Sequence, residues 1–303
     1  MVAGGRINNY EEWNISTVGI LTGELGYRQF PNLPTGIDAM SLTLNNGKML
    51  ICGGWNNEKK CLQLENGTWK VHSILNNERL YHSAVTTSSA TFLFGSYNSW
   101  DTYEYLPKDS TTWLPGKTGI PIGFESGCAI AVKSEKEIWL IGGCGTNDRI
   151  LSFNVSDQTF QELHSQLNVG RFRHRCAFIP NTKKIMITGG EGYDPYANEG
   201  YGSIVSLNST EIIDTEDGSI TMGNPMNFKR NMHGMGVVTS NGINRMAVFG
   251  GFDGETELTT VELYNTQTQK WEITNIKLSE EKQNFGFLTV NLADIYLNFN
   301  AHS

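Results

Sequence analysis

The sequence predicts an all-β chain built from six copies of one repeat. The first indication is a short apolar run ending in a glycine pair, which recurs along the whole chain. The second is the glycine content: 33 of 303 residues exceeds the usual ~7%, and without a three-residue period it indicates many tight turns. The third is the lack of convincing long stretches with the period of a helix. Dividing 303 residues by six gives about 50 residues per repeat.

The glycine pair is the most regular marker of the repeat. Short apolar stretches such as 246–249 precede it, as expected of buried inner strands. Glycines at a strand end allow positive φ angles and a close approach of neighbouring backbones. The copies are Gly4-Gly5, Gly53-Gly54, the degenerate Gly95-Ser96, Gly142-Gly143, Gly189-Gly190 and Gly250-Gly251.

Two further markers keep step with the glycine pairs. After each pair comes a strand-like stretch and a turn, followed in most copies by an aromatic residue; the clearest copy runs from Thr260 to Tyr264 and continues to Trp271. Before each pair comes an alternating strand, which in three copies opens with Arg-x-x-His. Those openings are Arg79 with His82, Arg171 with His174, and Arg230 with His233.

Together the three markers resemble the kelch repeat. The resemblance covers nearly the whole chain and implies that residues 1–303 form one six-bladed kelch-type β-propeller, with one four-stranded blade per repeat. An ordinary β-sandwich, in which the glycine pairs coincide by chance, is the less favoured alternative. The expected blades span residues 1–31 together with 283–291, then 36–74, 79–118, 123–165, 170–225 and 229–277.

The chain begins at an inner strand, so the first blade needs its innermost strand from elsewhere. We expect residues 285–290 to supply it. Pairing between the N-terminal strands and this C-terminal strand would close the ring and remove an open sheet edge. Removal of residues 283–303 should then unfold the chain or cause aggregation.

Composition excludes several classes of protein. The formal charge of −8 argues against nonspecific nucleic-acid binding, and no apolar run approaches the ~20 residues of a membrane span. No signal peptide precedes residues 2–5; either one has been removed or the protein is intracellular, and we favour a secreted protein over a cytoplasmic one. The five cysteines leave at least one unpaired within the chain. Cys52 and Cys61 flank a hairpin and could bridge it, but the sequence leaves the pairing open.

The resemblance also locates a binding face. In a propeller the loops that enter and leave the inner strands gather around the axis, and in the kelch family this face commonly binds partners. The Arg-x-x-His openings and the residues after the glycine pairs should form a cationic and aromatic ring there. The expected ligand-binding residues are Trp55, Arg79, Tyr81, His82, Tyr97, Arg171, Arg173, Tyr193, Tyr196, Arg230, Asn231 and Phe252. A structural role for the Arg-x-x-His residues, which would hold adjacent blades together through loop carbonyls, is an equally open alternative.

The fifth copy breaks the repeat with a long loop at residues 191–202. Insertions in a repeat map to loops, often on the binding face. Tyr193, Tyr196 and Tyr201 would supply stacking area and hydroxyls at low entropic cost. A mobile loop without a function is the alternative.

From these features we expect a non-catalytic, monomeric interaction module that binds a protein or an acidic peptide. No nucleic-acid partner, cofactor or metal is expected, since the histidines and cysteines lack metal-ligand spacing. The alternative is a kelch-type propeller enzyme or lectin acting on a sugar or sugar acid. In such an enzyme Arg171 or Arg230 would hold the carboxylate, and Glu125 or Glu191 would act as acid or base.

Overall fold

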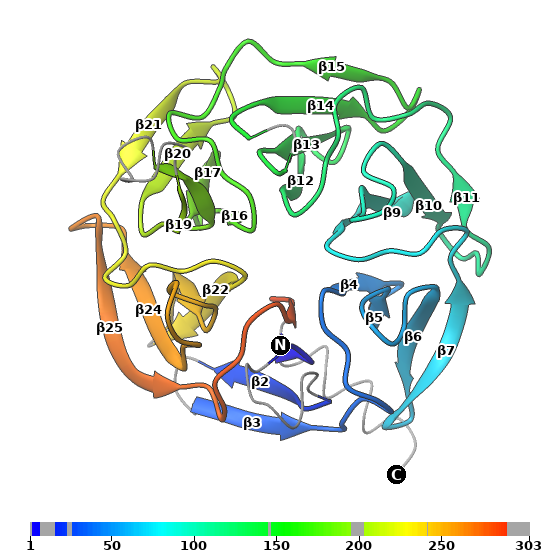
Figure 1. Cartoon of the computed structure of the whole chain (residues 1–303), viewed down its shortest axis with the longest axis horizontal. Helices are drawn as coiled ribbons and strands as arrows, with labels where there is room; N and C mark the ends of the chain where they lie inside the picture. The colour runs from blue at the N-terminus through cyan, green and yellow to red at the C-terminus, as the bar shows by residue number, and fades with distance from the viewer. Residues whose placement is uncertain are drawn as a thin grey trace.

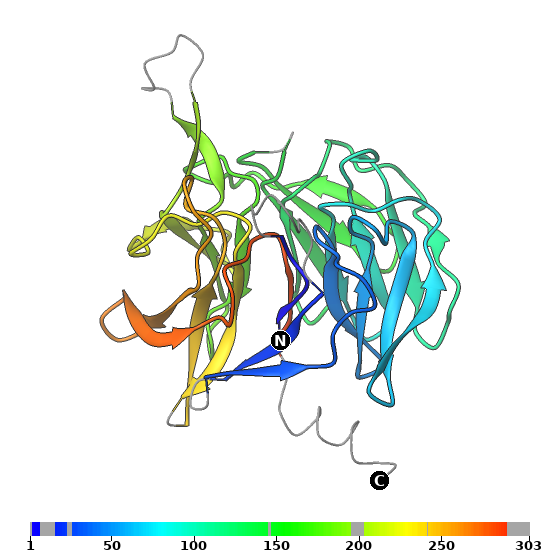
Figure 2. The same ribbon diagram turned by 60° about the horizontal axis from the view of Figure 1, so that its bottom comes forward.

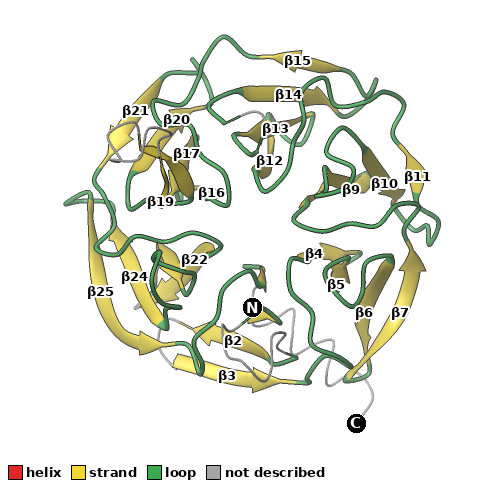
Figure 3. Ribbon diagram, viewed as in Figure 1, coloured by secondary structure: helices red, strands yellow, loops and turns green. Residues whose placement is uncertain are grey.

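The structure is a computed structural model that describes residues 2–6, 16–22, 26–144, 147–194, 203–240 and 242–289. These residues form strands, turns and loops (Figure 3), and none of their elements is a helix long and apolar enough to cross a membrane. Antiparallel sheets stand side by side around a central axis (Figure 1). The fold is therefore an all-β propeller, as the repeat pattern predicts.

Five four-stranded sheets each come from one stretch of the chain. The first contains β4 (Ser41–Asn45), β5 (Lys48–Cys52), β6 (Lys60–Glu65) and β7 (Thr68–Ile74). The second contains β8 (Ser83–Thr86), β9 (Ala90–Phe94), β10 (Tyr103–Pro107) and β11 (Leu114–Pro115). The third contains β12 (Cys128–Val132), β13 (Glu137–Ile141), β14 (Ile150–Asn154) and β15 (Phe160–Glu162).

The fourth sheet contains β16 (Arg175–Phe178), β17 (Lys184–Thr188), β20 (Thr210–Asp214) and β21 (Ile220–Gly223). A separate two-stranded sheet, β18 (Glu191–Asp194) with β19 (Ser203–Ser206), is inserted between β17 and β20. The fifth sheet contains β22 (Gly234–Ser240), β23 (Ile243–Phe249), β24 (Thr260–Asn265) and β25 (Lys270–Lys277). In each of these sheets the first strand lies nearest the axis and the last lies at the rim (Figure 1).

One further four-stranded sheet joins the two ends of the chain. Its order is β26 (Gly286–Phe287), β1 (Val2–Ala3), β2 (Val18–Thr22) and β3 (Gly26–Phe30). Val2 pairs with Phe287 and Ala3 pairs with Gly286. The innermost strand of this sheet thus comes from the C-terminal part of the chain, and the other three come from the N-terminal part.

A cycle of backbone hydrogen bonds runs around the axis just before the innermost strands. Each sheet contributes one residue with positive φ, between 49° and 58°, and its N–H donates to the carbonyl of the equivalent residue in the preceding sheet at 2.6–3.0 Å. The N–H of Ala39 donates to the carbonyl of Asn284 and completes the cycle. The members are Ala39, Tyr81, Ser126, Arg173, Met232 and Asn284. We call this set the axial ring.

The glycine pairs join neighbouring sheets. The second glycine of a pair donates its N–H to a carbonyl at the start of the next sheet, as Gly54 does to Arg79 at 2.8 Å and Gly190 does to Arg230 at 2.8 Å. A Cβ on Gly53, whose φ is +64°, would lie 2.3 Å from the Arg79 carbonyl oxygen. Only glycine allows both the conformation and this close approach.

The tryptophans of the repeat, on or next to the outermost strands, pack against the preceding sheet. Trp113 is buried among residues of β5, β6 and β9, and its Nε1 donates to the Ser73 hydroxyl at 2.9 Å. Trp69 is buried beside Ala3 and donates to the Pro31 carbonyl at 3.0 Å. The core therefore consists of apolar layers between sheets, and these layers join each sheet to its neighbour.

Two disulfides settle the cysteine pairing that the sequence leaves open. Cys52 and Cys61 are direct partners across β5 and β6. Cys128 and Cys176 join β12 to β16, the innermost strands of two adjacent sheets. Cys144 is a free, exposed thiol.

Candidate functional site

The three repeat arginines do not line an accessible face. Arg79, Arg171 and Arg230 are each fully buried and form ion pairs with fully buried glutamates. They occupy the interior between strands, where each guanidinium group also donates to backbone carbonyls, so their geometry gives no support to the expected contact with a ligand. The structure thus favours the alternative structural role for the Arg-x-x-His openings.

Each arginine makes the same set of contacts. The Arg230 guanidinium group donates to the carbonyls of Gly250 and Thr260 at 2.8 and 3.1 Å and to Glu262 at 3.1 Å. Glu262 also accepts hydrogen bonds from the backbone and side-chain amides of Asn227, both at 2.7 Å. The same network connects Arg79 with Glu104 and Asn76, and Arg171 with Glu211 and Asn168.

The other repeats replace this network as a unit. Where Ile37 takes the arginine position, Leu62 takes the glutamate position, and both lie in one apolar cluster. Phe124 and Leu151 form a second apolar replacement of the same kind. In both repeats a proline, Pro34 or Pro121, stands where the ionic repeats have asparagine, so no amide N–H is left without an acceptor there. In the sequence, each Asn-x-x-Arg is thus accompanied by a glutamate later in the same repeat, and the repeats that lack the arginine lack the asparagine and the glutamate as well. This joint presence or absence is the signal that identifies these arginines as structural.

The sheet made from both chain ends uses a lysine instead. Lys282 is fully buried and donates to the Thr17 hydroxyl at 2.9 Å. Glu280 forms an ion pair with it at 2.8 Å and replaces the absent strand glutamate. Burial is the main cause that lowers the pKa of Lys282.

The repeat histidines are also buried and neutral. Burial, with a smaller effect of the Arg79 charge, lowers the pKa of His82 to about 3. Its Nε2 lies 2.8 Å from the Ser41 hydroxyl, and the Nε2 of His233 lies 2.8 Å from the Thr188 hydroxyl. Burial lowers the pKa of His233 as well. These residues connect neighbouring strands and do not present a cationic surface.

The residues after the glycine pairs lie beside the turns that lead into the innermost strands. Each donates its backbone N–H, at 2.7–3.0 Å, to a carbonyl of the turn that precedes an innermost strand; they are Arg6, Trp55, Tyr97, Cys144, Glu191 and Phe252. We call the surface formed by these residues and the loops that follow them the mouth face. The side chains of Trp55 and Tyr97 are 41% and 59% exposed, and that of Trp100, three residues after Tyr97, is 57% exposed.

The hairpin of β18 and β19 extends the mouth face outward. It projects from the ring as the yellow-green strands in Figure 2. Tyr193 and Ile204 are cross-strand partners, and both side chains are more than 60% exposed. The hairpin of the fifth-repeat insertion therefore exposes an aromatic and an aliphatic side chain next to each other. Tyr196 and Tyr201 lie outside the described residues.

Arg173 is the predicted arginine that remains near the surface. Its guanidinium group forms an ion pair with Glu191 at 3.0 Å and lies over the rings of Tyr81 and Phe172 at 5.9 and 5.4 Å. Burial raises the pKa of the nearby Glu125 carboxyl, although the Arg173 charge opposes this effect. Arg173 is therefore already paired with an acidic side chain and packed against aromatic rings at this face.

Among the twelve predicted ligand-binding residues, exposure falls into three groups. The exposed ones are Trp55, Tyr97 and Tyr193, and the half-buried ones are Tyr81, Arg173 and Phe252. The buried ones are Arg79, His82, Arg171, Arg230 and Asn231, while Tyr196 is not described. Trp100 and Ile204 were not predicted, because neither belongs to a repeat marker.

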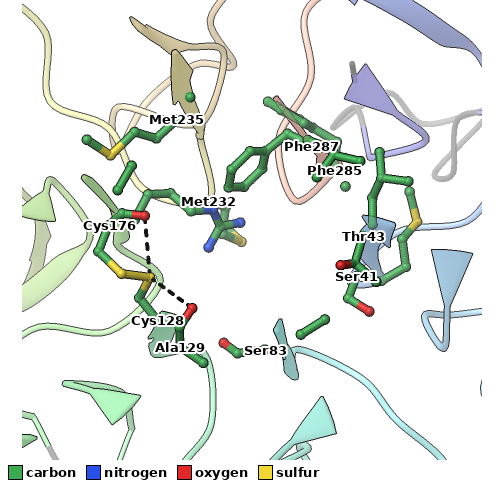
Figure 4. Close-up of a pocket in the computed structure, with 18 of the residues that line it drawn as sticks. Ser41, Thr43, Ser83, Cys128, Ala129, Cys176, Met232, Met235, Phe285 and Phe287 are labelled. Carbon is green, nitrogen blue, oxygen red and sulfur yellow. Dashed lines mark hydrogen bonds between the residues drawn. A yellow bond between two sulfur atoms is a disulfide. The ribbon is translucent and has the colours of Figure 1, made fainter. Parts of the chain in front are cut away.

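A cavity of about 370 Å³ occupies the axis below the axial ring. Residues from different sheets converge on it, among them Ser41, Ser83, Met232 and Phe285 (Figure 4). Its lining contains two arginines, Arg173 and Arg175, and no aspartate or glutamate. Within the described ranges no three His, Cys, Asp or Glu side chains gather as a metal site would require.

Comparison with known proteins agrees with the repeat and the fold. A family model of the Kelch motif matches residues 244–275, which span β23, β24 and most of β25. A solved structure described as "Structure of YjhT" is similar with a TM-score of 0.69 and 12% identity, over 85% of this chain and 88% of that chain. At this identity the likeness shows the fold alone. No curated protein matches the chain.

The matched motif and the ring of sheets define the class of protein. The chain is a β-propeller that carries a Kelch motif at residues 244–275.

Proposed function

We propose that this propeller is a non-catalytic binding module that holds a protein or peptide ligand on the mouth face. One observation carries the proposal: exposed aromatic side chains concentrate there, namely Trp55, Tyr97, Trp100 and Tyr193. Tryptophan and tyrosine dominate binding energy at protein interfaces, and groups of exposed apolar side chains commonly mark interaction sites.

The backbone of the mouth face supports this use. Trp55 and Tyr97 follow the strand ends directly, and their backbone N–H groups bond to Asp38 and Leu80 at 2.9 and 3.0 Å. Side chains presented from an anchored backbone lose less entropy on binding than side chains on an unanchored one. The aromatic surface is therefore preorganised for a ligand.

The ligand chemistry that we propose differs from the sequence expectation in one respect. A preference for acidic peptides depended on Arg79, Arg171 and Arg230, whose charges are buried and compensated. Arg173, closest to the surface, already forms an ion pair with Glu191. We therefore propose that the ligand is a peptide segment that packs against the exposed aromatic side chains and does not need to carry negative charge.

The alternative of an enzyme or lectin for sugars or sugar acids has weaker support. Arg171 and Arg230 are buried and unable to hold a substrate carboxylate. Glu191 is held by Arg173, and only Glu125, with its pKa raised by burial, retains a feature of a general acid. The exposed tyrosines and tryptophans remain compatible with stacking on a sugar ring.

Selection from a displayed library of random dodecapeptides tests the proposal. Peptides selected on the unmodified protein are expected to lose at least about tenfold in affinity on Trp55→Ala/Tyr97→Ala, which removes two aromatic anchors. The matched control is Ile243→Ala. Ile243 is the first residue of β23, pairs with Ser240 at the end of β22 away from the mouth face, and has a side chain that is 60% exposed.

The control should retain full affinity. Equal binding to all three proteins, or failure to select any peptide, would refute the proposed surface. Binding of neutral sugars or sugar acids that is lost in the same double variant would instead support the lectin or enzyme alternative.

We also propose that the sheet β26-β1-β2-β3 serves as the sixth blade and closes the ring. The pairing of Ala3 with Gly286 and the hydrogen bond from Ala39 to Asn284 support this proposal. Truncation after Lys282 removes both contacts and is expected to yield an unfolded or aggregated chain. Truncation after Thr289 keeps both contacts and serves as the control. An unchanged melting temperature after the longer truncation would contradict closure.

The two disulfides support the secreted location that we favour, because such bonds persist in oxidising compartments.

A further inference from the structure

The axial cavity contains a charge that no acidic side chain of the described residues balances. The first residues of the innermost strands are Ser41, Ser83, Cys128, Arg175, Gly234 and Gly286. Arg175 is the charged member of this set, and it lines the cavity just below the axial ring. The repeat does not require arginine here, since each other sheet has a small neutral residue.

Arg175 has no acidic partner within the part of the chain that the structure describes. One terminal nitrogen donates to the carbonyl of its neighbour His174 at 3.0 Å, and its Nε is enclosed without a hydrogen-bond partner. The guanidinium group lies 5.1 Å from the centre of the Phe287 ring. By contrast, the buried repeat arginines each have a glutamate within 3.1 Å.

The groups around Arg175 do not compensate its charge. His174 and His233 face it from two sheets, and burial lowers the pKa of both, so that both are neutral at physiological pH. Burial lowers the pKa of Arg175 itself to about 10, which still leaves it protonated. Arg175 is half-buried where it lines the cavity. A largely desolvated cation without a nearby counter-charge is costly, and a bound anion relieves that cost.

We propose that the axial cavity is an anion site in which Arg175 binds the carboxylate of a small organic acid. The guanidinium fork suits a carboxylate, with which it forms two parallel hydrogen bonds. The remaining wall includes Leu42, Met235 and Phe287, which would pack against an apolar body. The volume of about 370 Å³ lies within the range of small-molecule sites.

This site is separate from the aromatic surface of the mouth face. Arg175 lies inside the channel, whereas Trp55 and Tyr97 are exposed around its entrance. The two proposals can therefore fail independently. A carboxylate that fits the cavity could be a free metabolite or the acidic side chain of a bound partner, and the chemistry of recognition is the same in both cases.

Thermal unfolding with hexanoate and with neutral hexanamide, at equal ionic strength, tests the anion site. Hexanoate is expected to raise the melting temperature by about 5 °C at a concentration about 100-fold above its Kd, because it binds the folded state alone. Hexanamide has the same apolar body without the charge and should have little effect. In the absence of ligand, Arg175→Met should be at least as stable as the unmodified protein, since it removes an uncompensated cation.

Three variants identify the responsible group. Arg175→Met is expected to lose the response to hexanoate, Arg175→Lys to keep part of it, and the surface variant Arg149→Met to keep it fully. The double variant Trp55→Ala/Tyr97→Ala should also respond fully, which separates this site from the mouth face. A response that persists in Arg175→Met, an equal response to hexanamide, or no response in the unmodified protein would overturn the proposal. A soluble peptide with an internal glutamate and an amidated C-terminus that competes with hexanoate would identify a partner side chain as the source, and absence of competition would favour a free acid.

Discussion

Replacement of Arg230 by isoleucine tests the structural role of the repeat arginines. The substitution leaves the buried Glu262 carboxylate without its ion-pair partner, and it leaves the carbonyls of Gly250 and Thr260 without donors from the guanidinium group. Glu262 keeps two hydrogen bonds from Asn227. Removal of one partner from a buried pair commonly costs about 3–5 kcal/mol, and we expect a loss in that range.

The chain itself provides the compensating substitutions. The apolar repeat has Pro34, Ile37 and Leu62 at the positions of Asn227, Arg230 and Glu262. The triple variant Asn227→Pro/Arg230→Ile/Glu262→Leu removes the charge pair together with the asparagine amide that depends on it. It should recover most of the lost stability, to within about 2 kcal/mol of the unmodified protein, because a well-packed apolar group can replace a buried ion pair.

Urea unfolding followed by tryptophan fluorescence and circular dichroism measures these differences. Arg149→Ile is the control, since Arg149 forms a partly exposed ion pair with Glu162 at 3.6 Å and should cost less than about 1 kcal/mol. A loss below about 1 kcal/mol for Arg230→Ile would refute the structural role of the arginine. A triple variant as unstable as the single variant would refute the coupled replacement.

Two further predictions concern protonation and covalent links. The pKa of His82 is about 3 in the folded state, against 6.5 when the side chain is solvated. The neutral buried imidazole therefore contributes fully to stability above pH 6.5, and this contribution is lost as the pH falls toward 3, with a slope of about 1.4 kcal/mol per pH unit. Urea midpoints that stay constant from pH 7 to pH 5 would contradict this. Cys128→Ser/Cys176→Ser should lower the unfolding free energy by up to about 4 kcal/mol, the loop entropy for a separation of 48 residues. In the unmodified protein, thiol labelling in denaturant without reductant should modify Cys144 alone. An unchanged urea midpoint of the double variant, or more than one labelled thiol in the unmodified protein, would show that the disulfide is absent.

The burial of the arginines is the instructive difference between sequence and structure. The sequence places Arg79, Arg171 and Arg230 at equivalent positions, but a position at the opening of an inner strand is compatible with either surface or interior. Their partners lie 25–40 residues further along the chain. The pairing depends on the register between strands, which a residue pattern alone does not specify.

Local pattern by itself predicted the repeat, the all-β propeller and the use of glycine pairs, and it put Trp55 and Tyr97 at equivalent positions of the repeat. These features follow from short-range chemistry, since φ preference, apolar alternation and aromatic spacing are all encoded within one repeat. The tertiary structure decided the features that need contacts between repeats: the axial ring, the disulfide between Cys128 and Cys176, and the neutralisation of the repeat arginines. It also decided that Arg175 has no acidic partner among the described residues, because that property depends on which groups the neighbouring sheets bring to the axis.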